Sequence, residues 1–197
     1  GCRTYHVCLI SDRTHCRTDA EAAGPERDTK SWNQQWRSPL REAMNWLSEK
    51  IAEIYRDESR DIFSDPALAR NEYIDLVLDR SDESLDWFFS RTADADLSRD
   101  QRVQALKLLE MRRNALLMYT SCGWFFDEIS GIETVQVMKY ACRAMQLARE
   151  LTGADLEPEY KRILAEAKSN VRTAGTGADI YTAYVSNTIV DISRIAV

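Results

Sequence analysis

The chain has 197 residues, of which 44% are hydrophobic and 29% charged, and its formal net charge is −6. This length allows one large domain or two small ones, with enough buried apolar surface to fold without disulfides. The acidic balance and the lack of any cluster of positive charge argue against nucleic acid as a partner. No apolar run reaches the ~18 residues of a bilayer span, and no signal-peptide pattern is visible, so we expect a cytoplasmic protein without membrane contact.

Residues 1–30 have no helical period and differ from the rest of the chain. They hold five residues of types that bind zinc, namely Cys2, His6, Cys8, His15 and Cys16. Their spacing lacks the repeated paired pattern of a zinc motif, and the adjacent His15 and Cys16 would struggle to reach one ion together. We therefore expect an irregular, reduced segment without metal or cofactor, followed by a helical domain over residues 31–197. A zinc-stabilised module remains the alternative for this segment.

From Trp32 onward the pattern is helical. The whole chain contains only seven Gly and four Pro, two residues that interrupt helices. Ser38-Pro39 predicts a helix start, with Ser as the cap and apolar residues recurring to about Arg56. Asp65-Pro66 and Ser81 predict the starts of two further helices.

Two long helices form the predicted centre of the domain. Ser98 and Gln101 match a capping box, and the helix that follows should run to about Tyr119. Its expected buried residues are Val103, Leu106, Leu109 and Leu116, with Leu108 and Leu117 widening the apolar stripe. We expect Cys122-Gly123 to end this helix, because Gly commonly follows a helix terminus.

A second capping box is predicted at Ser130, with Glu133 as its partner, at the start of the next long helix. Gly153 should end that helix. Pro158 predicts the start of another helix. We expect a last helix over residues 179 to about 195, although the β-branched residues of that segment would also suit a strand. No strand–helix alternation appears elsewhere, so the expected class is all-α, a multi-helix bundle with two long central helices joined by an aromatic loop.

The loop between the two long helices combines aromatic rings with two carboxylates. Asp127 and Glu128 suggest an acid–base pair, but glycoside hydrolysis needs two carboxyl groups facing one bond across about 5–9.5 Å. Adjacent residues rarely converge in this way, so we expect no catalytic residue in this chain. Trp124 beside these acids is nevertheless a combination found in sugar sites, where aromatic faces pack on a pyranose ring and carboxylates accept from its hydroxyls.

Three blocks of sequence resemble one known family. They occur in the same order as in the helical region that follows the catalytic barrel in a bacterial branch of glycoside hydrolase family 57. The blocks are Trp32-Asn33-Gln34-Gln35-Trp36-Arg37-Ser38-Pro39-Leu40-Arg41, Tyr73-Ile74-Asp75-Leu76-Val77-Leu78-Asp79-Arg80-Ser81, and the run from Ala115 to Val137 that contains Gly123-Trp124-Phe125-Phe126-Asp127-Glu128. The resemblance covers about residues 31–170.

The resemblance implies a role in α-glucan chemistry, as in amylases, glucanotransferases and branching enzymes. The carboxylate pair of such enzymes lies on a barrel, for which this chain has no strand–helix pattern. The implied partner is therefore a catalytic barrel of the same polypeptide, and the implied function is that of a helical accessory domain that packs on the barrel and lines its substrate cleft. Whether the parent enzyme hydrolyses or transfers, and on which linkage, stays open.

The resemblance makes Trp124, Phe125, Asp127 and Glu128 the candidate glucan-binding residues. The competing interpretation is a buried corner in which Trp124 and Phe126 belong to the core and Asp127 caps a helix. Trp32 and Trp36 are further candidates, with core packing as the favoured role. A helical protein-interaction scaffold without a sugar site is the alternative function, and the surface that would meet a barrel makes self-association of the isolated chain an expected property.

Overall fold

The structure is a computed structural model that describes residues 32–186. Over this range the chain forms helices and no strand, apart from isolated bridges between Phe63 and Ala93 and between Lys168 and Thr176. The all-α prediction is therefore confirmed. The segment 1–30, with its candidate zinc ligands Cys2, His6, Cys8, His15 and Cys16, lies outside the described residues, as does the part of the predicted last helix beyond Ser186.

Helix α1 (Arg37–Glu58) packs against α4, α6 and α7 along one apolar face. The predicted cap at Ser38 is wrong, because the N-cap of the helix is Trp36, two residues earlier, and the Ser38 hydroxyl donates to Glu42 Oε1 at 3.2 Å. The chain enters through a tight turn, in which the Arg37 N–H already donates to the Gln34 carbonyl at 3.1 Å. A side-chain cap is therefore not needed at this terminus.

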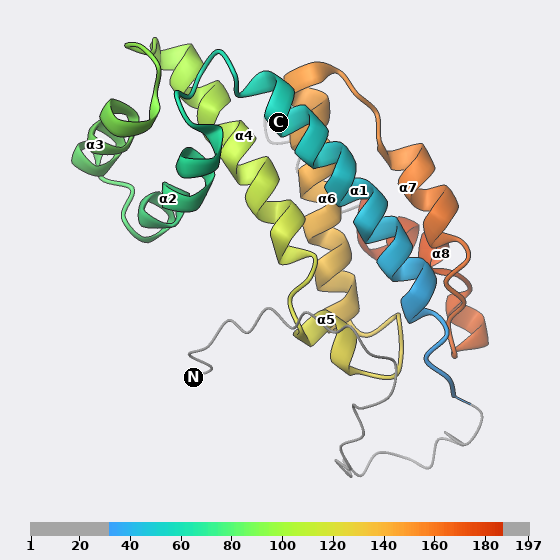
Figure 1. Cartoon of the computed structure of the whole chain (residues 1–197). Helices are drawn as coiled ribbons and strands as arrows, with labels where there is room; N and C mark the ends of the chain where they lie inside the picture. The colour runs from blue at the N-terminus through green and yellow to red at the C-terminus, as the bar shows by residue number, and fades with distance from the viewer. Residues whose placement is uncertain (1–31, 187–197) are drawn as a thin grey trace, which may run out of the picture.

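Helices α2 (Pro66–Leu78) and α3 (Asp82–Thr92) form a hairpin that packs on α4 through α2. Both predicted caps are confirmed. Asp65 accepts hydrogen bonds from the N–H groups of Ala67 and Leu68 at 2.9 and 3.0 Å, and Ser81 accepts from the N–H of Ser84. In Figure 1 this hairpin lies at one end of the molecule, away from α7 and α8.

Helices α4 (Arg99–Leu117) and α6 (Ile132–Thr152) are the central pair and pack more extensively on each other than any other two helices. The Ser98–Gln101 capping box is confirmed. The predicted core face of α4 is partly wrong, because Val103 and Leu116 are exposed. Leu108 and Leu109 are buried as predicted, and α4 also buries Ala105, Met111, Asn114 and Ala115.

The connection between α4 and α6 contains a short helix, α5 (Cys122–Phe125), instead of a plain loop. Gly123 does not end α4, which finishes at Leu117; it lies inside α5, where a Cβ atom would stand 2.4 Å from Val137 Cγ1. The predicted Ser130 cap is also wrong. Gly131 is the N-cap of α6 without a side-chain bond, and Glu133 stands one position too early in the helix for a capping box.

Gly153 ends α6 as predicted, with a φ of 76° in the left-handed region that favours glycine. Helix α7 (Glu157–Leu164) follows, with Pro158 in its first turn, and a short 3₁₀ turn η2 (Arg172–Ala174) leads to α8 (Gly177–Tyr184). Helix α8 begins two residues before the predicted Asp179, because Thr176 is its cap and forms a capping box with that residue. Helix α7 packs on α1, and α8 packs on α7 and α6 (Figure 1).

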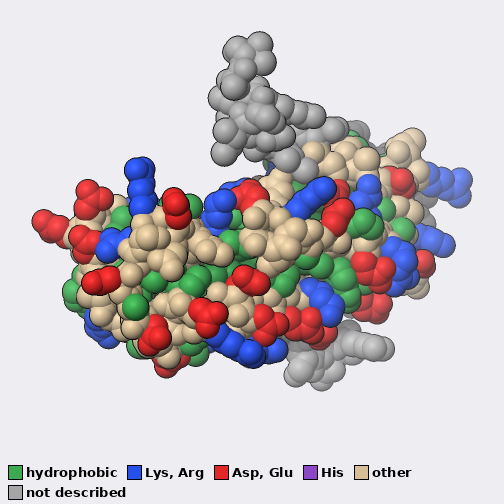
Figure 2. All heavy atoms as spheres, turned by 90° about the horizontal axis from the view of Figure 1, so that it is seen from above, with side chains coloured by type: hydrophobic (Ala, Val, Ile, Leu, Met, Phe, Trp, Pro, Cys, Tyr) green, Lys and Arg blue, Asp and Glu red, His purple; other side chains and the backbone are tan. Residues whose placement is uncertain are grey.

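Figure 2 shows Lys and Arg side chains interspersed with Asp and Glu side chains over the described part of this face. Hydrophobic side chains are visible between them only in small groups on this face. On this face the Asp and Glu side chains are thus scattered and do not gather into a single acidic patch. Within the described range no helix has both the length and the apolar character needed to cross a bilayer.

Candidate functional site

The end of α5 presents two aromatic rings to solvent. Phe125 and Phe126 are 52% and 47% exposed, and their ring centroids are 5.4 Å apart at an interplanar angle of 86°. Asp127 follows directly and is also exposed. We call Phe125, Phe126 and Asp127 the aromatic platform. The interpretation that placed Phe126 in the core is wrong, since burial of Trp124 turns the next two side chains of this short helix outward.

The backbone of the platform is held by side chains from other segments. Arg37 Nη2 donates to the carbonyls of Phe125 and Phe126 at 3.1 and 3.0 Å. The carbonyl of Asp127 accepts from the indole N–H of Trp36 at 3.2 Å and from the side-chain amide of Asn170 at 2.7 Å. Three successive carbonyl groups are therefore satisfied by the protein, which limits the motion of the platform.

Asn170 links the platform to the segment that precedes α1. Its side-chain amide also donates to the Asn33 carbonyl at 2.9 Å, and its Oδ1 accepts from the Asn33 N–H at 3.1 Å. From the same segment, Gln34 Nε2 donates to Asp127 Oδ1 at 2.9 Å. Residues far apart in the sequence thus meet around Asp127.

Glu128 points away from the platform and into the protein. Its Oε2 accepts from the Asn170 N–H at 2.9 Å, and its Oε1 accepts from the Ser169 hydroxyl and from the Ser130 N–H. Three donors leave this carboxylate little capacity for a ligand. In the described structure Glu128 joins the α5–α6 connection to the segment before η2.

Trp124 is partly buried and packs on the core. Its indole N–H donates to the Met118 carbonyl at 3.2 Å, and its ring faces the Arg41 guanidinium at 5.2 Å. The same guanidinium lies 4.9 Å from the Tyr119 ring. Burial raises the pKa of the Tyr119 phenol, whose hydroxyl donates to Asn45 Oδ1. The Trp124 side chain therefore fixes the orientation of α5.

The other two candidate tryptophans differ in position. Trp36 is 1% exposed and reaches the platform only through its bond to the Asp127 carbonyl. Trp32 is half-buried in the segment before α1, next to Asn33. The structure brings Trp36, Phe125, Asp127 and Glu128 together.

Sequence reasoning missed the residues that hold the platform in place. These are Asn33, Gln34, Arg37, Ser169 and Asn170. Local patterns offered no signal for them, because polar residues in short connections are common and their partners lie in distant segments. The composition of the α5 region and the resemblance block that contains Asn33, Gln34 and Arg37 marked the neighbourhood without assigning these roles.

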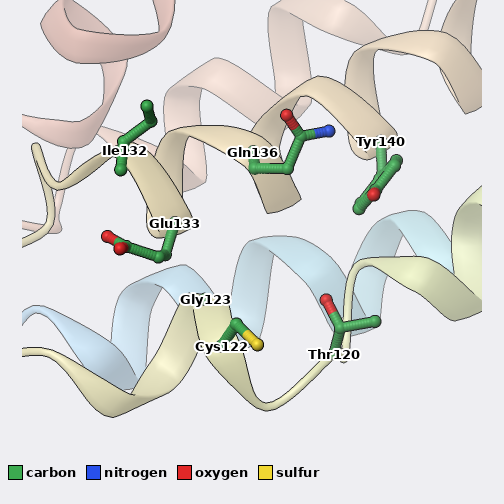
Figure 3. Close-up of a pocket in the computed structure, with 7 residues that line it drawn as sticks. All are labelled: Thr120, Cys122, Gly123, Ile132, Glu133, Gln136 and Tyr140. Carbon is green, nitrogen blue, oxygen red and sulfur yellow. The ribbon is translucent and has the colours of Figure 1, made fainter. Parts of the chain in front are cut away.

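A groove lies beside α5, on the side of α6. It has a volume of about 400 Å³ and is lined by Thr120, Cys122, Gly123, Ile132, Glu133, Gln136 and Tyr140 (Figure 3). We call it the α5–α6 groove. Within the described part of the chain, no group of three or more His, Cys, Asp and Glu residues could hold a metal ion.

A family model described as a domain of unknown function (DUF3536) matches residues 32–197. No curated protein matches the chain. No solved structure matches it either.

Proposed function

We propose that this chain, which belongs to the DUF3536 family, is a helical accessory domain of an α-glucan-processing enzyme similar to glycoside hydrolase family 57. In this proposal the domain works in the cytoplasm and packs on a catalytic barrel of the same polypeptide. The barrel supplies the catalytic carboxylates, and the domain lends the aromatic platform to the substrate cleft. The sequence blocks that resemble glycoside hydrolase family 57 include the aromatic platform and the segment before α1 that holds the platform in place.

The observation that carries the proposal is the exposed aromatic pair with a carboxylate beside it. Because the two rings are nearly perpendicular, one of them can lie flat against a pyranose ring while the other contacts its edge. Asp127 keeps one carboxylate oxygen beyond the one that accepts from Gln34, and this oxygen can accept from a sugar hydroxyl. These are the two kinds of contact that a neutral sugar chain requires.

The anchoring of the platform supports a binding role over a purely structural one. Hydrogen bonds from Arg37, Trp36 and Asn170 hold its backbone while its side chains face solvent. A pre-organised surface loses little conformational entropy when a ligand binds.

The test is α-glucan turnover by the complete polypeptide that contains the barrel, compared with its Phe125→Ala and Asp127→Asn variants. We expect KM for a malto-oligosaccharide to rise about fivefold for Phe125→Ala with kcat retained, because a lost aromatic contact is worth about 1 kcal/mol. Tyr184→Ala removes another exposed aromatic ring, at the end of α8, and serves as the matched control. An inactive complete polypeptide, or an unchanged KM in folded Phe125→Ala, would refute the proposal.

A second candidate, a protein-interaction scaffold without a sugar site, is favoured by the surface of α2. This helix buries Tyr73 and Leu76 on one side but exposes Ile74 and Leu78, which are one turn apart, on another. Exposed apolar side chains at such spacing are typical of a surface that another protein covers. If Leu78→Asp abolishes self-association or barrel docking while glucan turnover is independent of Phe125, the scaffold is the better account.

A further inference from the structure

We infer that the α5–α6 groove is a second carbohydrate site, which binds a pyranose unit of an α-glucan apart from the aromatic platform. The identity of the sugar chain as α-glucan rests on the proposed function, whereas the preference for a sugar rests on the groove itself. Its volume of about 400 Å³ is within the range of small-ligand sites, which is about 300–1,000 Å³.

The lining residues restrict the chemistry of the ligand. No lysine or arginine lines the groove, so a phosphate or carboxylate would meet Glu133 without a compensating cation. A purely apolar ligand that covers the Glu133 carboxylate and the Gln136 amide would displace water from them without offering a hydrogen bond, which is costly. A neutral molecule with many hydroxyl groups and one apolar face satisfies both conditions, and a pyranose ring has these properties.

The polar groups of the groove are available to such a ligand. Within the described residues, the side chains of Gln136 and Tyr140 form no hydrogen bond. The Thr120 hydroxyl donates to the Leu117 carbonyl at 3.0 Å, so its oxygen remains free to accept. Gln136 can both donate and accept, and Glu133 can accept, which matches hydroxyl groups that do both.

The side chains that line the groove come mainly from one face of α6. Ile132, Gln136 and Tyr140 are spaced four residues apart and therefore follow one another along that face. In Figure 3 these three side chains lie along α6 above Cys122 and Thr120, with the Tyr140 ring at one end. The ring of Tyr140 offers a face for the apolar side of the sugar, and Ile132, which is 78% exposed, extends the apolar surface at the other end.

The groove is formed before any ligand binds. The Thr134 hydroxyl, which is buried, donates to the Gly123 carbonyl at 2.9 Å and ties α5 to α6. Gly123 allows the two helices to approach so closely that a Cβ atom there would overlap Val137. The width of the groove is therefore set by packed atoms, and a ligand does not need to order them.

The test is a titration of the isotopically labelled 197-residue chain with maltotetraose, followed by backbone amide chemical shifts. We expect saturable shifts at Gln136 and Tyr140, and about a tenfold loss of affinity in Tyr140→Ala, since an aromatic contact and a hydrogen bond are both lost. Because Tyr140 is partly packed on the core, its replacement could also affect folding. Gln136 is exposed, so Gln136→Ala serves as a second variant, with an expected loss of affinity of about threefold. Tyr184→Ala, which removes a tyrosine outside the groove, should bind like the unmodified chain.

The result separates this inference from the proposed function. If the chain gives no saturable shifts, or if Tyr140→Ala and Gln136→Ala bind as tightly as the unmodified chain, the inference is overturned even where Phe125→Ala impairs turnover. If the complete polypeptide has no α-glucan activity but the titration depends on Tyr140, the proposed function fails and the groove remains a sugar site. Phe125→Ala should leave the groove affinity unchanged in the isolated chain.

Discussion

The tight contact between α5 and α6 makes Gly123→Ala a sensitive test of the structure. A methyl group at this position would stand 2.4 Å from Val137 Cγ1, 2.8 Å from Val137 Cγ2 and 3.2 Å from the Glu133 carbonyl oxygen. Val137 is buried and Glu133 contributes backbone, so neither can move aside freely. We expect α5 to shift away from α6, with a loss of packing along the α5–α6 groove.

The magnitude follows from two opposing effects. Overpacking of a core position costs about 1–3 kcal/mol, whereas replacing glycine by alanine within a helix gains up to about 1 kcal/mol. With the full gain, the net effect of Gly123→Ala is a loss of about 0–2 kcal/mol in the free energy of unfolding. Val137→Ala alone should cost about 2–3 kcal/mol, because it removes two buried methyl groups and leaves a cavity.

The double variant tells whether the contact itself is responsible. In Gly123→Ala/Val137→Ala the new methyl group occupies space that the valine has left, so the combined loss should fall short of the sum of the single losses by about 1–2 kcal/mol. Urea denaturation of the four proteins at neutral pH measures all three differences, provided that the m-values agree. Strict additivity of the two single losses would refute the close approach of the two helices.

Three further outcomes are expected from urea denaturation. Thr134→Val leaves the Gly123 carbonyl without its side-chain donor and should cost about 1–2 kcal/mol, and a neutral effect would contradict the buried bond. Glu128→Ala should lower the free energy of unfolding by about 2 kcal/mol, because three donors lose their acceptor. Asp127→Ala should lower it by less than about 0.5 kcal/mol. Equal losses would contradict the buried role of Glu128 and the exposed role of Asp127. Burial raises the pKa of Tyr55 from 10.0 to about 12, as burial also raises the pKa values of Tyr73 and Tyr160. The part of the stability that Tyr55 contributes, measured as the difference between the unmodified chain and Tyr55→Phe, is present below pH 10 and should fall by about 2 kcal/mol as the pH rises to 12, and a difference that does not change over that interval would refute this.

Helix starts were predictable where a single side chain decides them. Asp65, Ser81 and Ser98 each accept from an N–H two or three residues ahead, so the cap and its partner lie within one turn of sequence. Ser130 and Glu133 have the same capping-box spacing, but the predicted N-cap is wrong by one residue, because the observed N-cap of α6 is Gly131. There the chain comes out of α5, and the Ser130 N–H donates to Glu128 Oε1, so the tertiary position of Glu128 decides where α6 begins.

The core face of α4 shows a different limit. A rule that favours large apolar residues chose Val103 and Leu116, yet the helix turns Ala105 and Ala115 toward its neighbours. Small residues permit the close packing of α4 on α6, so their small size is the reason for their burial. Asn114 is also buried, which sequence patterns disfavour, but its side-chain amide donates to the Glu110 carbonyl at 2.8 Å within the same helix.

The composition of the sequence predicted where the candidate site lies but not which residues form it. The aromatic and acidic residues at 124–128 marked the region, while the bonds that shape it join residues such as Asn33 and Asn170, which are 137 positions apart. No local pattern relates two such residues. Which aromatic side chain of the run 124–126 is buried also depends on the fold, because Trp124 packs against Arg41 of α1 and donates to the Met118 carbonyl at the end of α4.

The geometry of α5 explains why the platform and the groove occur together. Successive residues of a helix point about 100° apart, so a single turn with Gly123 and Trp124 against the protein must direct Phe125 away from it. The inward residues set the distance to α6, and with it the width of the groove, while the outward residues form the platform. A change at Gly123 should therefore disturb both surfaces, whereas Phe125→Ala and Tyr140→Ala should each disturb only one.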